Sequence, residues 1–429
     1  MKPFQAAVLG IFLFLALVGV FVFATFTSSR QDAIGEVVIW GSLPQDIVDD
    51  LLTIVRGTRD DFNGVTYRDF TKEELMPTLV QAIASGRGPD LILFPSSAFV
   101  KDGDKLQPIS YSTVPRRTFQ DTFVEAGEIF LTAEGIAALP MTIDPTVMYW
   151  NRTMFANASI ARPPKYWDEL ATQAPKLTKK QPNGSLITSA APLGSWDNAT
   201  HPKEILVTLL RQLGTTVITR DEEGLYRNVL AGTNDAEVSP AESAIHYLVD
   251  FADPVKPNYS WNRSQKNARD AFLAGTLALY FGPASELLSI RESNPNLNFD
   301  VAPMPIARGG GEGVYADVEA LAVPRGAANP GGATAVALIL VSAPISTELA
   351  KATRLPSPRR DVQLDASADQ YLTTFRASAL KAFAFMDPDP SASSAIFSRM
   401  IDNVASGRSR ISEAIRAADE ELRVLIRVQ

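Results

Sequence analysis

The feature that most constrains the fold is an alternation of apolar runs and helix-forming segments in the first quarter of the chain. Three runs rich in β-branched and apolar residues predict strands, at 37–42, 65–70 and 89–95. Two segments between them have helical spacing of their apolar residues, at 45–56 and 71–86. A β-α-β-α-β order of this kind predicts a parallel sheet with helices on both faces.

The second of these helices has clear start and stop signals. Thr71 followed by Glu74 makes a capping box, in which each side chain satisfies a free backbone amide of the first turn. Pro77 is expected to kink the helix, and Gly86 is a natural cap at its end.

The N-terminal region is a separate unit. Residues 6–26 form a run of 21 residues without a charge. At 1.5 Å per residue, such a helix spans roughly 30 Å, the thickness of the hydrocarbon core. The residues after it make a poor cleavage site, so we expect an uncleaved membrane anchor over 1–30; secretion after signal cleavage is the alternative.

Composition excludes several classes of function. The chain has no cysteine, which excludes disulfides and thiolate metal sites. Its net charge of −8 argues against nucleic acid as a partner, because phosphates are repelled. The two histidines are far apart, and no nucleophile elbow, phosphate loop or metalloprotease motif occurs. We therefore expect no enzyme, no cofactor and no metal site.

The ends of the predicted strands give the first candidate site residues. Open parallel sheets bind ligands beyond the carboxyl ends of their strands. Trp40 lies at the first of these ends, and Phe94 and Ser97 lie at the third. An aromatic ring with small polar neighbours suits a neutral polar ligand such as a sugar; for Trp40, packing in the core near a hinge is the alternative.

A longer stretch, residues 138–170, resembles a signature of the bacterial extracellular solute-binding proteins, family 1. These maltose-binding-protein-like proteins are the substrate-binding subunits of ABC importers. The signature positions are Pro140, Trp150-Asn151, Phe155, Pro163-Pro164 and Trp167-Asp168-Glu169-Leu170. Segments 84–94, 271–283 and 299–305 resemble further family motifs in the right order. Two positions depart from the pattern: Tyr166 stands where a helix-capping Thr is usual, and Leu279 where Met is usual.

The resemblance implies an α/β, two-lobed periplasmic-binding-protein-like fold of type II, preceded by the N-terminal transmembrane helix. It implies these boundaries: 36–142 for the first part of lobe 1, 143–300 for lobe 2, 301–360 for the return to lobe 1, and 361–429 for C-terminal helices packing on the lobes.

The resemblance and the loop positions add further candidate ligand contacts. These are Asp144, Trp196, Trp261, Tyr280, Tyr315, Asp317 and Glu319. Three of them have a simpler alternative: solvation in a loop for Asp144, and packing for Trp196 and Trp261. Some sugar-binding relatives carry a stacking Trp after the Gly282-Pro283 pair; Ala284 stands there, which weakens the case for a maltodextrin-like ligand and leaves a smaller ligand or a solute other than a sugar open.

The predicted function is that of a membrane-anchored, monomeric solute-binding protein on the outer face of the cell membrane. It would bind a small solute, a carbohydrate first of all, between two lobes that close around it. Its partners would be the transmembrane subunits of an ABC permease. Two alternatives remain at this stage: a tethered receptor that signals to a sensor partner, and an exported glycan hydrolase.

Overall fold

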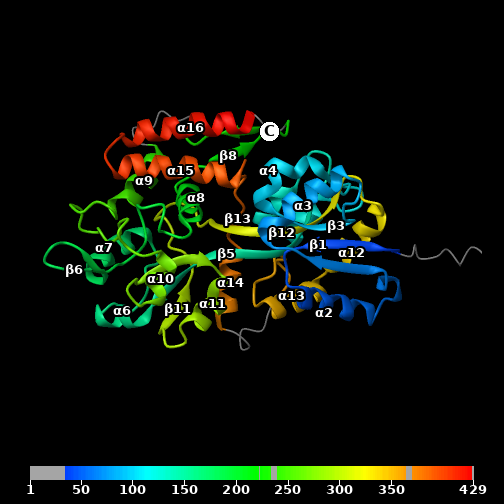
Figure 1. The fold of residues 1–429 in the computed structure, drawn as a ribbon, viewed down its shortest axis with the longest axis horizontal. Coiled ribbons are helices and arrows are strands. Elements are labelled where there is room, and N and C mark those ends of the chain that lie inside the picture. Colours follow the sequence, from blue (N-terminus) through cyan, green and yellow to red (C-terminus); the bar gives the residue numbers. More distant parts are fainter. Residues whose placement is uncertain (1–33, 222, 233–238, 364–369, 428–429) are drawn as a thin grey trace, which may run out of the picture.

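The computed structural model describes residues 34–221, 223–232, 239–363 and 370–427. These residues form two lobes that lie side by side and share one sheet (Figure 1). The predicted anchor over 1–30 lies outside the described residues. Within them, no single helix is long and apolar enough to cross a bilayer, and the one pair that reaches the combined length, α12 (Pro330–Leu340) and α13 (Ala343–Thr353), is bent by 68°.

The shared sheet has nine strands. Six of them run in the order β10-β5-β12-β3-β1-β2, while β11 pairs with β5, and β4 and β13 pair with β12. Their bounds are β1 (Val37–Gly41), β2 (Val65–Asp69), β3 (Leu91–Pro95), β4 (Leu106–Gln107), β5 (Leu139–Asn151), β10 (Leu279–Pro283), β11 (Phe299–Ala302), β12 (Val314–Pro324) and β13 (Ala382–Phe383). Two small ribbons pair β6 (Lys179–Lys180) with β7 (Leu186–Thr188), and β8 (Ile218–Arg220) with β9 (Tyr226–Asn228).

Lobe 1 confirms the predicted β-α-β-α-β unit. β1 lies between β2 and β3 and is parallel to both. Alternate side chains divide between two faces: Ile39 and Leu93 pack with α2 (Gln45–Arg56), α12 and α13, while Ile92 and Phe94 pack with α3 (Lys72–Ala84). Helices therefore cover both faces, as a parallel sheet requires. The lobe also contains the short α4 (Phe99–Asp102) and α5 (Arg116–Thr122).

Half of the predicted capping box of α3 is present: Thr71 caps the helix, whereas Glu74 bonds to the Thr71 hydroxyl instead of its backbone amide. Thr71 Oγ1 accepts a hydrogen bond from the Glu74 amide at 3.3 Å and donates to Glu74 Oε2 at 3.0 Å. Pro77 lies inside the helix, and Gly86 follows it in the left-handed conformation, with φ of 65°. This fixed start matters because Lys72, the first residue of α3, faces the other lobe.

β5 joins the lobes because it is long enough to belong to both. Leu139–Asp144 and Pro145 pair with β12 on the lobe 1 side, and the strand from Thr146 onward pairs with β10 and β11. β12 runs antiparallel beside it and reaches β13 at its other end. Two adjacent strands that pass between lobes form the usual mechanical basis of hinge closure.

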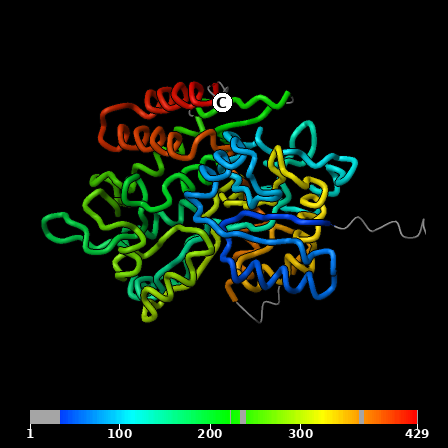
Figure 2. The backbone as a smooth tube through the Cα atoms, turned by 45° about the vertical axis from the view of Figure 1, so that its right-hand side comes forward, coloured from blue at the N-terminus to red at the C-terminus, as the bar shows by residue number. Residues whose placement is uncertain are grey.

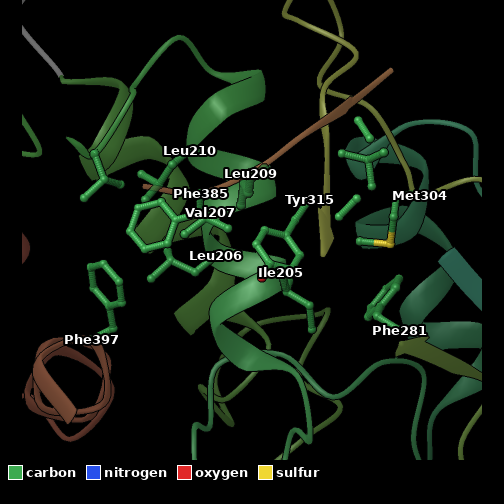
Figure 3. Close-up of a cluster of buried hydrophobic side chains, with 14 of the residues drawn as sticks. Ile205, Leu206, Val207, Leu209, Leu210, Phe281, Met304, Tyr315, Phe385 and Phe397 are labelled. Carbon is green, nitrogen blue, oxygen red and sulfur yellow. The ribbon is translucent and has the colours of Figure 1, made fainter. Parts of the chain in front are cut away.

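Lobe 2 is built around the second half of β5. Its helices are α6 (Arg152–Asn157), α7 (Trp167–Leu177), α8 (Pro202–Gln212), α9 (Pro240–Asp250), α10 (Ala268–Leu273), α11 (Glu286–Ser293) and α14 (Gln370–Ala379). Tyr149 and Tyr280 pack with residues of α10, α11 and α14 on one face, whereas Met148 and Phe281 belong to the core on the other face. Figure 3 shows this second core around α8, with Phe281, Tyr315, Phe385 and Phe397 converging on it.

The chain ends in two long helices, α15 (Pro390–Ala405) and α16 (Ile411–Arg427). They pack against each other and against α9. Both the ribbon and the view turned by 45° place them over lobe 2 (Figures 1 and 2).

The start of α7 shows how the chain compensates for the missing helix cap. Tyr166 provides no side-chain cap, but the amide of Trp167 donates to the Ile306 carbonyl at 3.2 Å. Glu169 Oε2 accepts from the Lys165 amide at 2.8 Å. The Ile306 carbonyl thus satisfies the first free amide of the helix, whereas a capping Thr would accept from the amide of the second or third helical residue.

Candidate ligand-binding site

The two strands that join the lobes bring two carboxylates together. In the antiparallel register of β5 and β12, Asp144 lies directly opposite Asp317. Glu319 follows two residues later in β12, opposite Thr142. All three carboxylates therefore lie in the short span where the sheet passes from one lobe to the other.

Lobe 1 contributes the polar wall around Glu319, which is 8% exposed. Its Oε1 accepts a hydrogen bond from Ser42 Oγ at 2.8 Å and lies 3.4 Å from Lys72 Nζ. Thr142 Oγ1 donates to its Oε2 at 3.4 Å. Ser42 follows the end of β1 and Lys72 follows the end of β2, so this wall lies at the carboxyl edge of the parallel strands.

Lobe 2 contributes the facing wall. The amide of Ser285, just after β10, donates to Asp144 Oδ1 at 3.0 Å. The next residue, Glu286, accepts from Tyr280 Oη at 2.6 Å, and its Oε1 lies 2.9 Å from His201 Nε2. His201 and Glu286 retain 22% and 19% side-chain exposure, so both side chains are partly accessible to solvent.

Asp317 connects the two walls. Its Oδ1 accepts a hydrogen bond from Tyr315 Oη at 2.6 Å. Its negative charge raises the pKa values of Lys72 and Asp144 on one side and of His201 and Glu204 on the other. We refer to the five carboxylates Asp144, Glu204, Glu286, Asp317 and Glu319 as the interlobe carboxylate cluster.

Burial shifts the protonation of this cluster. Burial raises the pKa of Asp144 to about 6, and the charge of Asp317 adds to the shift, while the bond from Ser285 opposes it. Burial likewise raises the pKa of Glu204. A carboxyl group with a pKa near 6 is able to accept a hydrogen bond when ionised and to donate one when protonated.

The His201–Glu286 pair is stabilised in its charged form. Burial alone would lower the pKa of His201, but the bond to Glu286 and the nearby carboxylates raise it overall. Burial alone would raise the pKa of Glu286, but the hydrogen bonds from His201 and Tyr280 lower it overall. The pair therefore presents a fixed donor and acceptor at the lobe 2 wall.

An aromatic pair lies at the strand ends of lobe 1. The rings of Trp40 and Phe70 are 4.8 Å apart, and the Arg68 guanidinium lies 4.8 Å from the Phe70 ring centroid. Trp40 is 8% exposed, whereas Phe70 is only half-buried. Phe70 follows β2 directly and its amide bonds to the Gly41 carbonyl, which holds the ring beside the end of β1.

The predicted site residues divide into two groups. Asp144, Asp317, Glu319 and Tyr315 come together in or beside the cluster; Tyr280 is fully buried but reaches Glu286 through its hydroxyl. Ser97 is half-buried in the short turn after β3, next to Ser96, whose Oγ accepts from the Val318 amide. Trp40 contributes to the aromatic pair.

Three other predicted aromatic contacts lie in packed surroundings. Phe94 is fully buried in the lobe 1 core. Trp261 is fully buried in lobe 2 and donates from Nε1 to Asn198 Oδ1 at 2.9 Å. Trp196 is 8% exposed and packs against Phe397. Both tryptophans therefore lie in packed surroundings, which is the alternative stated for them in the sequence analysis.

Sequence reasoning missed four members of the site: Lys72, His201, Glu204 and Glu286. Lys72 had a usable signal, because it follows a capping Thr at the end of a predicted strand. His201 and Glu204 belong to the first turn of α8, opened by Pro202, but nothing local relates that turn to β12. His201 is bonded to Glu286, which lies 85 residues further along the chain.

The cluster suits hydroxyl groups better than a metal ion. Among the described residues, no group of three or more His, Asp or Glu side chains is arranged to hold a metal. The carboxylates instead alternate with donors: Ser42, Lys72, Tyr315, His201 and Tyr280. Such alternation of acceptors and donors matches a ligand rich in hydroxyls.

Solved structures of similar shape are numerous. One is a cyclic alpha-maltosyl-1,6-maltose binding protein from Arthrobacter globiformis, with a TM-score of 0.76, 17% identity, and coverage of 92% of this chain and 99% of that chain. Another is a cyclo/maltodextrin-binding protein complexed with maltotetraose, with a TM-score of 0.74, 16% identity, and coverage of 94% and 99%. A third is the GacH receptor of Streptomyces glaucescens, with a TM-score of 0.69, 17% identity, and coverage of 92% of this chain and 98% of that chain. At these identities the likeness establishes the fold.

Among curated protein sequences, none matches this chain significantly. A family model described as bacterial extracellular solute-binding protein matches residues 59–374, which is most of the chain. That span contains all five residues of the interlobe carboxylate cluster. It also contains the elements that position the site, namely α3, β5, α8, β10 and β12. The chain belongs to the family of bacterial extracellular solute-binding proteins.

Proposed function

We propose that this protein binds a neutral carbohydrate between its lobes and delivers it to an ABC permease. The observation that carries the proposal is the interlobe carboxylate cluster, which draws on both lobes and lies at the carboxyl edge of β1 and β3. Carboxylates accept hydrogen bonds from sugar hydroxyls, and charge-assisted bonds of this kind are the strong ones. The solved relatives named above bind maltose-type oligosaccharides or acarbose, according to their titles, which supports a sugar here.

The aromatic pair supplies the apolar part of such a site. Sugar rings expose apolar C–H faces as well as hydroxyls, and aromatic rings in ligand pockets complement such faces. The half-buried Phe70, backed by Trp40, is the ring that we assign to this contact. With Ala284 in place of a second stacking ring, we infer a short ligand of one or two sugar units.

Closure of the lobes would complete the site. A sugar held by Glu319 on one wall and by Glu286 on the other gains its full set of bonds only when both walls approach it. The binding energy then favours the closed form by the difference in its contacts with the two states. The joining strands β5 and β12 lie directly beneath the cluster, so bending there moves one wall against the other.

The remaining parts of the proposal concern partners and location. We propose that residues 6–26 retain the protein at the outer face of the membrane and that it acts as a monomer. The transmembrane subunits of an ABC permease would be its partners, as the family implies. We also propose that the site performs no chemistry, although Asp144 and Asp317 lie opposite each other.

The test is a thermal-shift screen of the full-length protein in mild detergent. The panel contains glucose, maltose, mannobiose and maltotetraose, and, as charged solutes, a polyamine and an amino acid. A ligand of the native state raises the melting temperature, by an amount that grows with its affinity. We expect a neutral mono- or disaccharide to give the largest shift; a shift with the charged solutes alone would overturn the carbohydrate assignment.

The same sample tests the absence of catalysis. Incubation with the disaccharide that binds best should leave it intact, as followed by chromatography. Cleavage that disappears in an Asp144→Asn variant would show that the protein is a hydrolase instead.

A further inference from the structure

Lobe 2 contains a polar cavity, far from the interlobe carboxylate cluster. It is a cavity of about 360 Å³ at the far end of β5. Asn151 at that end is seven residues beyond Asp144, which is about 23 Å along an extended strand. Figure 1 shows the elements around it, including α6, α10 and β11, in lobe 2 on the side away from lobe 1.

The lining of this cavity has an unusual composition. The polar residues that line it are the five asparagines Asn151, Asn157, Asn294, Asn296 and Asn298, the threonines Thr153 and Thr188, and the lysines Lys176 and Lys179. Among the described residues that line it, none carries a carboxylate. We call it the amide–lysine cavity.

Asn151 shows that the cavity is built to bind. The residue is only 3% exposed, and its Oδ1 caps α6 by accepting from the Met154 amide at 3.0 Å. Its Nδ2 donates to no residue in the described part of the chain and is not fully enclosed, so this end of the side chain is open to the cavity. Gly275 lies beside that nitrogen, and its φ of 73° is a left-handed conformation that favours glycine.

The two lysines set the charge of the ligand. Lys176 and Lys179 are exposed, and neither forms an ion pair with a described residue. In a chain with a net charge of −8, two unpaired ammonium groups beside a cavity without carboxylates form a local positive site. An anion gains favourable interactions with both, whereas a cation is repelled.

We infer that the amide–lysine cavity is a second binding site, specific for a small hydroxylated anion such as a sugar acid or a sugar phosphate. The anionic group would lie between Lys176 and Lys179. The hydroxyls would bond to those amide atoms of the asparagines that have no protein partner, Asn151 Nδ2 among them. The volume fits about one sugar-sized molecule.

The site does not depend on the carbohydrate proposal for the cleft, because none of its residues belongs to the interlobe carboxylate cluster. It is also formed by lobe 2 alone. The anion should therefore bind whether or not the lobes are closed.

Calorimetric titration of the full-length protein tests this inference, with gluconate, glucose 6-phosphate, inorganic phosphate and glucose as separate probes at low salt. We expect gluconate or glucose 6-phosphate to bind. The one with the higher affinity shows whether the site prefers a carboxylate or a phosphate group. The double variant Lys176→Gln/Lys179→Gln should weaken that binding about tenfold. Both lysines are exposed, so these substitutions leave the core unchanged.

A second double variant, Lys180→Gln/Lys266→Gln, is the matched control. It removes the same charge from exposed lysines that do not line the cavity, and binding should stay within about twofold. Asp317→Ala should also leave anion binding unchanged, which separates this site from the cleft.

Four results would overturn the inference. They are binding of neither hydroxylated anion, equal affinity for glucose, equal affinity for inorganic phosphate, and equal weakening by the control variant.

Discussion

The two candidate sites of this molecule are opposite in charge and in architecture. The interlobe carboxylate cluster gathers five acidic side chains from both lobes, and all of them except Glu204 accept a hydrogen bond from a neighbouring donor. The amide–lysine cavity gathers amides and two lysines from lobe 2 alone. A site shared by two lobes can couple ligand binding to closure, whereas a site inside one lobe cannot. The comparison suggests that the protein separates a transported ligand from a second ligand by charge.

The strongest test of this contrast is Asp317→Ala. This residue connects the walls of the cluster, and each hydrogen bond to a charged group contributes about 1.5–3 kcal/mol. We expect affinity for the best sugar of the screen to fall about 10- to 100-fold, measured by calorimetry, with anion binding unchanged. Asp121→Ala is the control, since Asp121 is exposed and pairs only with Arg117 among the described residues. An unchanged sugar affinity would place the sugar site elsewhere.

Asp144→Asn should stabilise the protein at neutral pH. The folded pKa of Asp144, about 6, lies above its ordinary value of 3.8. A raised pKa contributes stability that is fully present below about pH 3.8 and is lost as the pH rises through about 6. Asparagine does not titrate, so at pH 7.5 the free energy of unfolding should increase by about 1–3 kcal/mol.

The measurement is urea unfolding, followed by tryptophan fluorescence at several pH values. The wild type should lose stability relative to Asp144→Asn between about pH 4 and 6. An exposed counterpart, Asp121→Asn, should show no such divergence. Parallel curves for wild type and Asp144→Asn would mean that burial does not raise the pKa of this carboxyl.

Salt should affect the two sites differently. A neutral sugar held by hydrogen bonds should keep its affinity within about twofold from about 20 mM to about 300 mM salt. Gluconate or glucose 6-phosphate in the amide–lysine cavity should weaken about three- to tenfold over the same range, because its lysines are exposed. Calorimetry at both ends of the range measures this, and equal salt dependence at the two sites would contradict the contrast in charge.

The smallest expected effect is that of Thr71→Ala. Loss of the helix cap should cost about 1 kcal/mol of stability and loosen the first turn of α3, which carries Lys72. Sugar affinity should fall a few-fold. Ser239→Ala removes the equivalent cap of α9, where Ser239 Oγ accepts from the Glu242 amide, and should cost the same stability without changing sugar affinity. Equal losses of affinity in both variants would show that Lys72 plays no part in binding.

The sequence predicted the part of the fold that depends on local patterns. The strands and helices of residues 37–95 and the helix cap at Thr71 follow from periodicity and turn chemistry, and the structure confirms them. The family resemblance is confirmed over 59–374. Tyr166 was identified as a missing cap, and the compensating carbonyl of Ile306 could not be foreseen because it comes from a distant segment.

The site was only partly predictable because it depends on long-range register. Asp144 and Asp317 were each candidates, but their pairing is fixed by the antiparallel alignment of β5 with β12. Trp261 illustrates the opposite difficulty. Its polar neighbours in the sequence suggest an exposed loop. In the structure, however, the distant Asn198 accepts a hydrogen bond from Trp261 Nε1, which allows the ring to be completely buried.

A crystal structure of the protein with its best sugar tests the central claim most directly. We predict electron density for the sugar between the lobes, with its hydroxyls within hydrogen-bonding distance of Asp317 and of at least one of Glu319 and Glu286. Density in the amide–lysine cavity alone, or contacts with only one lobe, would contradict the account.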